Sequence, residues 1–410
     1  MTIEKIKILQ VAHNSEWALA RFFSSLKKDS VAKRFELVGV CGVEKTVEDA
    51  VESLERGIYT RIEMMDSSGK NFRPGNRKEE IKSALELIRK LSSGKIKYYH
   101  VNGAESIQEA YDKSEAKAVV IHSKNTTHLK YIEKAVENKL HVLCEKPLVP
   151  VLDEEGKPEK RYLGKLEKVI DRAEKKLVSL MDAEHYSYKE ASVSFYENLE
   201  DILEGKKIKK VRGEILEKDD PDFWRTKEIL SQQNRTGILG DTMCHLLAFV
   251  SNLDGTAVAK SREYDNYSNG MKYDIDTNDK VTYSIRGERF VRGAEAIFEV
   301  GKFIHKRKKP LKEESKKMVF TLEDDSEVIL DFKNGAVEKR KRGRKIGDYV
   351  SEHDVDINEY VQILGHFYKS IINQKQSRTS MRRSLRTLSA IASSYELPKK
   401  YNKVGGLYKK

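Results

Sequence analysis

The sequence predicts an α/β domain with a doubly wound parallel sheet, followed by an α+β domain with an open, mainly antiparallel sheet. Up to about residue 150, short and almost wholly apolar runs alternate with segments of helical spacing, as buried parallel strands do. Beyond that point apolar and polar residues alternate with period two, as in antiparallel strands that bury one face. The 410 residues suffice for two domains of ordinary size.

The apolar runs of the first domain are separated by helical segments. A β-branched-rich run at 6–11 precedes a helical segment at 18–26, and ELVGVC at 36–41 gives a second strand. AVVIH at 118–122 and HVLCEKP at 141–147 give two more strands, and the proline at 147 ends the second of them. This strand–helix repetition predicts a parallel sheet with helices packed on it.

Changes in composition predict the domain boundaries. We expect the first domain to cover residues 1–150, with an insertion at about 50–97 that is longer than an ordinary connection. The α+β domain is expected at 151–395, where period-two alternation is clearest at 279–332, and residues 396–410 are interpreted as a tail. We also expect the C-terminal helices to return and pack near the first domain.

The net charge of +12 is large, and charged residues make up 35% of the chain. Because Lys and Arg are spread along the whole sequence, a solvated lysine-rich surface is favoured over a nucleic-acid or membrane surface. The densest basic run, at 339–345, lies between two strand-like segments and is interpreted as an exposed hairpin or loop. No nucleic-acid-binding motif accompanies it, so we expect neither nucleic acid nor a membrane as a partner.

The three cysteines, at 41, 144 and 244, are odd in number and include no C-x-x-C pair. This argues against a disulfide framework and against a zinc site, and no metal site is expected. The first residues, MTIEKIKILQ, lack the apolar run of a signal peptide, and no run reaches the length of a membrane span. The sequence therefore favours a cytoplasmic protein.

Polar side chains that could take part in catalysis or binding follow two predicted strands of the parallel sheet. Ligands of such sheets bind beyond the carboxyl ends of the strands. Lys146 follows the strand in HVLCEKP and could stabilise a developing oxyanion there, although a lysine that only reaches solvent is the alternative. Asn125 and His128 follow the strand at 118–122, in a turn where capping of the next helix by Asn125, Thr126 or Thr127 is the alternative.

Asp241 and His245 are four residues apart, so on an α-helix they share one face. A carboxylate that orients an imidazole is a common general-base arrangement. The alternative is an aspartate that interacts with the helix dipole and a hydrogen-bonded histidine in the core.

Three segments resemble one family in order and separation. AVVIHSKNTTH at 118–128, HVLCEKPL at 141–148 and GILGDTMCHLL at 237–247 are similar to motifs of the glucose–fructose oxidoreductase and inositol dehydrogenase family, Gfo/Idh/MocA. The resemblance covers residue 1 to about residue 395. It implies a Rossmann-like dinucleotide-binding domain, then a substrate-binding domain whose sheet often forms a homo-oligomer interface. It also implies an NAD(P)-dependent oxidoreductase acting on a secondary hydroxyl of a sugar, cyclitol or sugar derivative.

The resemblance also implies roles for single residues. His245 would take the proton of the hydroxyl, Asp241 would fix both substrate and His245, and Lys146, followed by an often cis Lys–Pro bond, would support the oxyanion. His185 and Tyr186 would line the substrate pocket with Asp241 and His245. The contacts to NAD or NADP would fall on Ala12, His13, Asn14, Ser123, Asn125, His128, Glu145 and Lys146.

The first turn departs from the family's pattern. Ala12, Asn14 and Trp17 stand where the G-x-G-x-x-G loop has its three glycines, which shape the turn and let the pyrophosphate approach. Asn14 tolerates a left-handed conformation, whereas Trp17 cannot pack as closely as glycine. Gly42 stands where the family has an acid that holds the adenosine ribose, and the nearby Glu44 could substitute for that acid. The alternative function is therefore a non-redox binding or regulatory protein that has lost standard cofactor binding.

Overall fold

The structure is a computed structural model that describes residues 4–12, 15, 18–67, 77–153, 157–217, 237–267, 275–302, 314–351, 358–374, 377–398 and 400–401. The chain forms two compact units. The N-terminal unit consists of Met1–Leu148, Lys168–Ala183 and Asn358–Ser380. The C-terminal unit consists of Val149–Glu167, Glu184–Ile357 and Met381–Lys410. Each unit is described by itself.

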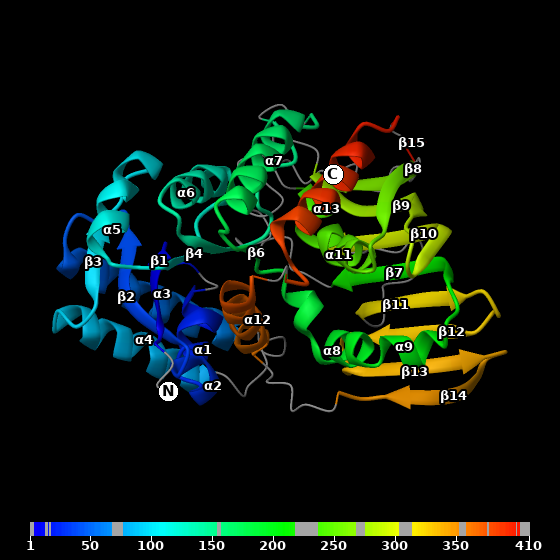
Figure 1. Cartoon of the computed structure of the whole chain (residues 1–410), viewed down its shortest axis with the longest axis horizontal. Helices are drawn as coiled ribbons and strands as arrows, with labels where there is room; N and C mark the ends of the chain where they lie inside the picture. Colours follow the sequence, from blue (N-terminus) through cyan, green and yellow to red (C-terminus); the bar gives the residue numbers. More distant parts are fainter. Residues whose placement is uncertain are drawn as a thin grey trace. The chain divides into compact units, whose positions relative to one another are not determined.

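The N-terminal unit is built on a six-stranded sheet in the order β3-β2-β1-β4-β5-β6, in which every pair is parallel (Figure 1). Its strands are β1 (Ile6–Val11), β2 (Phe35–Gly42), β3 (Lys97–His100), β4 (Ala118–Ile121), β5 (His141–Cys144) and β6 (Leu180–Asp182). All four residues of β4 are buried, as the apolar run predicted. The sheet confirms the Rossmann-like fold, and its order reverses between β1 and β4, where such sheets bind their ligands.

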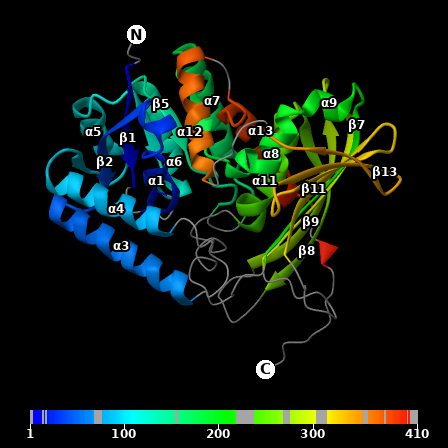
Figure 2. The ribbon, with the colours of Figure 1, turned by 90° about the horizontal axis from the view of Figure 1, so that it is seen from below.

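The helices of this unit pack around the sheet strands. They are η1 (Ala18–Phe22), α1 (Phe23–Ser25), α2 (Asp29–Ala32), α3 (Val47–Ser67), α4 (Arg77–Ser92), η2 (Ala104–Ser106), α5 (Ile107–Lys113), α6 (Asn125–Glu137) and α12 (Glu359–Asn373). The described part of the insertion at 50–97 consists largely of α3 and α4, which lie side by side (Figure 2). Helix α4 also packs against α1, which ties the insertion to the unit.

Helix α12 belongs to the N-terminal unit although it lies far along the chain, which confirms the expected return for one of the C-terminal helices. The helix at Met381–Tyr395 belongs instead to the C-terminal unit. Phe367 stacks on Phe35, with ring centroids 6.2 Å apart and planes at 11°. The side chain of Asn358 donates to the carbonyl oxygen of Arg21 at 3.1 Å and contacts the hydroxyl of Ser25 at 2.8 Å. These contacts anchor the start of α12 to the segment that follows the first turn.

The C-terminal unit contains a nine-stranded open sheet in the order β14-β13-β12-β11-β7-β10-β9-β8-β15. Its strands are β7 (Ile208–Glu217), β8 (Thr256–Tyr267), β9 (Ile275–Arg286), β10 (Val291–Lys302), β11 (Ser315–Leu322), β12 (Glu327–Asp331), β13 (Ala336–Lys341), β14 (Arg344–Tyr349) and β15 (Lys400–Tyr401). The pairs β7–β10 and β8–β15 are parallel and the others are antiparallel. The predicted open, mainly antiparallel sheet is confirmed.

Helices pack on this sheet through apolar faces. They are η3 (His185–Tyr188), α8 (Glu190–Glu197), α9 (Leu199–Leu203), η5 (Leu239–Met243), α11 (Cys244–Asn252) and α13 (Met381–Tyr395), while α7 (Lys160–Lys175) runs across both units. Helices α11 and α13 contact each other and β8, and α8 contacts β12 and β13. Within the sheet, Arg262 of β8 and Asp279 of β9 form a buried bidentate pair at 2.6 and 2.9 Å.

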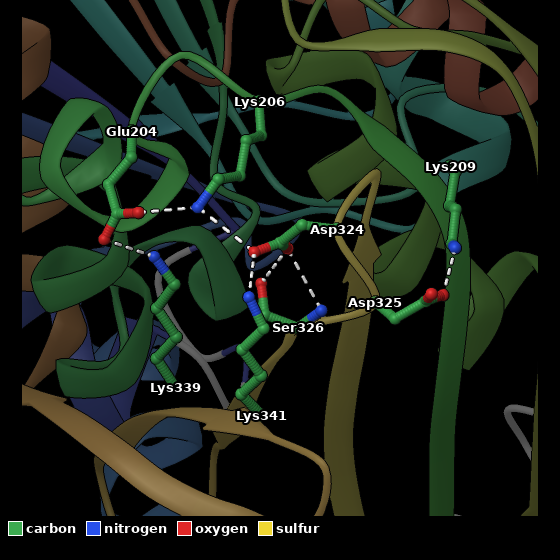
Figure 3. A network of polar contacts seen from close by, with 8 residues as sticks. All are labelled: Glu204, Lys206, Lys209, Asp324, Asp325, Ser326, Lys339 and Lys341. Carbon is green, nitrogen blue, oxygen red and sulfur yellow. Dashed lines mark hydrogen bonds and ion pairs between the residues drawn. The ribbon is translucent and has the colours of Figure 1, made fainter.

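The basic run at 339–345 forms the predicted hairpin, with β13 and β14 joined at Arg342 and Gly343. Two of its lysines belong to a network with carboxylates (Figure 3). Lys339, whose side chain is 2% exposed, binds Glu204 at 2.7 Å, and Lys341 binds Asp324 at 3.1 Å. Pairing with acids weakens the field that this run could offer to a nucleic acid.

The three cysteines are buried and take part in no disulfide. Among the helices in the described ranges, none is long and apolar enough to cross a membrane.

Candidate active site

The carboxyl ends of three neighbouring strands form one edge of the N-terminal unit. The backbone N–H of His122 donates to the carbonyl oxygen of Val11 at 3.1 Å, and that of Glu145 donates to Ile121 at 2.9 Å. The residues that follow β1, β4 and β5 are therefore held side by side. The sheet thus gathers Ala12, Ser123 and Glu145, three of the residues predicted to contact a cofactor.

The turn after β1 keeps a glycine-like backbone without a glycine. Ala12 has φ of 62°, a left-handed value that favours glycine, and its N–H donates to Cys41 at 3.0 Å. The N–H of Ser15 donates back to Ala12 at 3.1 Å, and the hydroxyl of Ser15 accepts from the N–H of Ala18 at 3.2 Å. The left-handed position is therefore at Ala12. The predicted contacts His13 and Asn14, and Trp17, lie outside the described residues.

The second strand ends without an acidic side chain at Gly42. Glu44, the proposed substitute, is held toward β3, because the hydroxyl of Tyr98 lies 2.8 Å from its backbone carbonyl oxygen and 3.0 Å from its carboxylate. His100 contacts the same carbonyl oxygen at 2.8 Å. The acid nearest the expected ribose position is thus engaged in contacts of its own.

A chain of buried polar side chains crosses this edge from β1 to β5. The amide of Gln10 donates to Val11 O at 2.7 Å and lies 3.2 Å from Nδ1 of His122, whose Nε2 lies 3.1 Å from the hydroxyl of Tyr360. The Tyr360 hydroxyl in turn donates to the carboxylate of Glu145. Because Nδ1 of His122 accepts from the amide of Gln10, the proton of the neutral ring is on Nε2. His122 therefore donates to the Tyr360 hydroxyl, which donates to Glu145.

His128 and Asn125 lie in the turn and first helical residues after β4. Nδ1 of His128 is 3.0 Å from the carbonyl oxygen of Pro147, and its Nε2 is 2.7 Å from that of Ser123. Burial lowers the pKa of His128 to about 4, although the two carbonyl oxygens pull it upward. Asn125 is a buried first residue of α6, and the capping position belongs to Lys124, so the capping alternative for Asn125 does not describe this turn.

Lys146 follows β5 and is half-buried. The peptide bond between Lys146 and Pro147 is cis, as the family resemblance implied.

His245 lies at the start of α11 in the C-terminal unit, with 5% of its surface exposed. Its Nδ1 is 2.5 Å from a carboxylate oxygen of Glu184. That same oxygen accepts the N–H of Tyr186 at 3.0 Å, while the other accepts the N–H and hydroxyl of Ser187 at 2.9 and 2.6 Å. Glu184 thus caps η3 and holds His245 with one carboxylate.

The charge state of Glu184 follows from its partners. Complete burial would by itself raise the pKa of this carboxyl, but the hydrogen bond and charge of His245 and the donors of Ser187 outweigh burial and lower it. The carboxylate is therefore ionised and accepts the proton on Nδ1 of His245. In the neutral ring this leaves a lone pair on Nε2, which is the state that a general base requires.

The predicted substrate residues His185 and Tyr186 both contact the ring of His245. Tyr186 stacks on it with centroids 4.2 Å apart and planes at 21°. His185 meets it edge-on, with centroids 4.7 Å apart and planes at 73°. The structure thus brings three of the predicted residues into one cluster.

Asp241 lies in η5, a π-helical turn that ends just before α11. Its carboxylate accepts the hydroxyl of Thr242 at 3.3 Å. The contact to Nδ1 of His245 comes from Glu184, a partner that the sequence did not predict.

Glu184 and Tyr360 were not found from the sequence. Glu184 did carry a signal, since it lies two residues after the strand at 180–182 and directly before His185 and Tyr186. Tyr360 carried none, because it meets His122 and Glu145 only through the return of α12.

Residues 32–160 match the oxidoreductase family GFO_IDH_MocA, described as having an NAD-binding Rossmann fold. The match covers the motifs at 118–128 and 141–148 and confirms the resemblance to this family. No curated protein matches the chain significantly in sequence.

Solved structures of low sequence identity share the fold over nearly the whole chain. UDP-N-acetylglucosamine 3-dehydrogenase GnnA from Acidithiobacillus ferrooxidans is 15% identical, with a TM-score of 0.62, covering 96% of this chain and 98% of its own. A levoglucosan dehydrogenase in complex with NADH and levoglucosan is 13% identical, with a TM-score of 0.67 and coverages of 96% and 97%. The 3-ketoreductase KijD10 from Actinomadura kijaniata, in complex with NADP and TDP-benzene, is 12% identical, with a TM-score of 0.63 and coverages of 95% and 96%.

Proposed function

We propose that this chain, whose residues 32–160 match the Gfo/Idh/MocA oxidoreductase family, catalyses NAD(P)-dependent oxidation of a secondary hydroxyl on a sugar, cyclitol or sugar derivative. The observation that carries the proposal is the buried pair of Glu184 and His245. A buried ionised carboxylate is costly unless it is bonded, and this one has four donors, one of them an imidazole. Such a pair suits proton transfer better than it suits packing.

The backbone of the N-terminal unit suits a dinucleotide better than its side chains do. The strand order, the left-handed turn at Ala12 and the gathered edge of β1, β4 and β5 are what such a cofactor needs. Residues that would hold it are Ala12, His13, Asn14, Ser123, Asn125, His128, Glu145 and Lys146. Because Gly42 stands where an acid would select a free ribose hydroxyl, NADP is at least as suitable as NAD.

The chain's own residues divide the chemistry of hydroxyl oxidation. A nicotinamide cofactor, when bound, would supply the hydride acceptor. His245 takes the hydroxyl proton on Nε2 while Glu184 holds Nδ1 and stabilises the imidazolium. Lys146 supports the developing oxyanion, and Asp241 binds a substrate hydroxyl. His185 and Tyr186 limit the positions open to the substrate beside the imidazole.

The substrate class rests on the family and on the names of the relatives with similar folds. Those relatives are named as a sugar 3-dehydrogenase, a levoglucosan dehydrogenase and a 3-ketoreductase. Two of these names specify a sugar substrate, which supports the sugar class in the proposal.

A substrate screen with two variants tests the proposal. Polyols, sugars and nucleotide sugars are offered with NAD and with NADP, and the nucleotide released on denaturing the purified protein is identified by mass spectrometry. On any substrate found, His245→Ala and Lys146→Ala should each lower turnover at least about 100-fold while nucleotide binding persists. A near-full rate in His245→Ala would remove the histidine from the base role.

The competing function is a binding or regulatory protein without redox turnover, which the absent glycines favour. It takes over if no nucleotide binds and no substrate reacts. We also propose a homo-oligomer formed through the C-terminal sheet, and light scattering that gives the mass of a monomer would refute it.

A further inference from the structure

We propose that Glu184, His185 and His245 form a site for a divalent cation of the zinc class, in which the ion replaces the proton between His245 and Glu184. One carboxylate oxygen of Glu184 and one ring nitrogen of each histidine lie within 4.8 Å of one another. All three residues belong to the C-terminal unit. Two imidazoles and a carboxylate are a ligand set that zinc uses when one position stays open.

The carboxylate is already oriented as a metal ligand would be. Backbone N–H groups of Tyr186 and Ser187 and the Ser187 hydroxyl hold three of its acceptor directions, and the remaining one faces Nδ1 of His245. Donors behind a ligand fix its direction and raise its affinity for a metal. Burial of Glu184 and His245 also removes the competing water.

The geometry requires only a small expansion. Nδ1 of His245 and the Glu184 oxygen are 2.5 Å apart with a proton between them. Two ligands of a tetrahedral zinc ion at about 2.0–2.1 Å from it are roughly 3.3 Å apart, so the pair must open by about 1 Å. His185, half-buried and edge-on to His245, supplies the third ligand and a route to solvent.

Occupation by zinc would change the tautomer of His245. The ion takes the lone pair on Nδ1, so the proton of the neutral imidazole moves to Nε2 and no net proton is released. A ring protonated on Nε2 has no lone pair to accept a substrate proton. Zinc would therefore block the base, a consequence that rests on the proposed function, whereas binding itself does not.

Calorimetric titration of the full chain, freed of metal by dialysis against a chelator and carrying no histidine tag, tests the site with ZnCl₂. We expect one ion per chain, and visible absorption typical of four-coordinate Co²⁺ when CoCl₂ is used. His185→Gln should weaken binding at least about tenfold, the scale seen for lost metal-site partners. The matched control His100→Gln, an exposed histidine of the other unit, should bind as the wild type does.

Absence of binding, or equal affinity in His185→Gln and wild type, would overturn the site. Glu184→Gln gives a second test, with its fold checked by circular dichroism, and it should also lose the ion. Zinc binding in a chain that turns over no substrate would leave the site standing and reject the proposed function. Turnover that zinc does not inhibit, despite stoichiometric binding that depends on His185, would refute replacement of the Nδ1 proton.

Discussion

His122 in the N-terminal unit and His245 in the C-terminal unit are both 5% exposed, but their partners differ. His122 lies between the amide of Gln10 and the hydroxyl of Tyr360, which are neutral. His245 lies against the carboxylate of Glu184. Burial, assisted by nearby His128, lowers the pKa of His122 to about 3, so this ring stays neutral.

The difference shows that burial alone does not make a histidine a base. A neutral environment holds His122 in one uncharged state, which suits a fixed polar contact. A carboxylate stabilises the imidazolium that forms on proton transfer, which suits catalysis. The partner, and not the depth of burial, separates the two histidines.

The largest expected effect comes from removing the charge that distinguishes the two sites. Glu184→Gln should lower kcat about 100-fold or more with little change in KM, because the imidazolium loses its counter-charge and its fixed tautomer. Nitrogen-15 NMR of the imidazole should show Nδ1 protonated in the wild type and a mixture in the variant.

Glu190→Gln is the matched control, since this exposed glutamate begins α8 in the same unit. It should keep both the rate and the tautomer. A normal rate in Glu184→Gln would mean that the carboxylate only caps η3.

An intermediate effect concerns His122 and pH. The folded pKa is about 3 and the ordinary value is 6.5, so between them the unfolded chain binds more protons than the folded chain. The contribution of His122 to stability is therefore complete above about pH 6.5 and is lost as the pH falls toward 3, amounting to about 2 kcal/mol by pH 5.

Hydrogen exchange of β1 and β4 amides at pH 8 and pH 5, corrected for intrinsic rates, measures this loss. In His122→Gln, the amide can still accept from Gln10 and donate to Tyr360. The stability lost between pH 8 and pH 5 should therefore be smaller by about 2 kcal/mol than in the wild type. His141 and His366, whose pKa values burial also lowers, remain in both proteins and serve as an internal reference. An unchanged acid loss would show that His122 is not the group that titrates.

The smallest expected effect lies in the turn of the N-terminal unit. Ala12→Gly should raise the free energy of unfolding by about 1 kcal/mol or less, because relief of the left-handed strain exceeds the added entropy of glycine. Thermal unfolding measures it. A clear loss of stability would mean that the Ala12 methyl group makes contacts worth more than the strain.

Short-range patterns predicted the fold and much of the candidate site. Apolar runs such as AVVIH follow directly from burial on both faces of a parallel sheet, and period-two alternation follows from one buried face. The strand-end residues Glu145 and Lys146 could be placed because strand ends in such a sheet meet at one edge. Spacing could not reveal the π-helical turn that contains Asp241, because such a turn depends on packing beyond the local repeat.

The sequence by itself determined the two sheets, the order of the strand-end motifs and the choice of His245, since each depends on neighbours within a few residues. The tertiary structure alone decided the partners. Glu184 reaches His245 across 61 residues, and Tyr360 reaches Glu145 across 215. Local periodicity holds no information on such pairs, because they form only when distant segments pack together and a buried charge must find its donors.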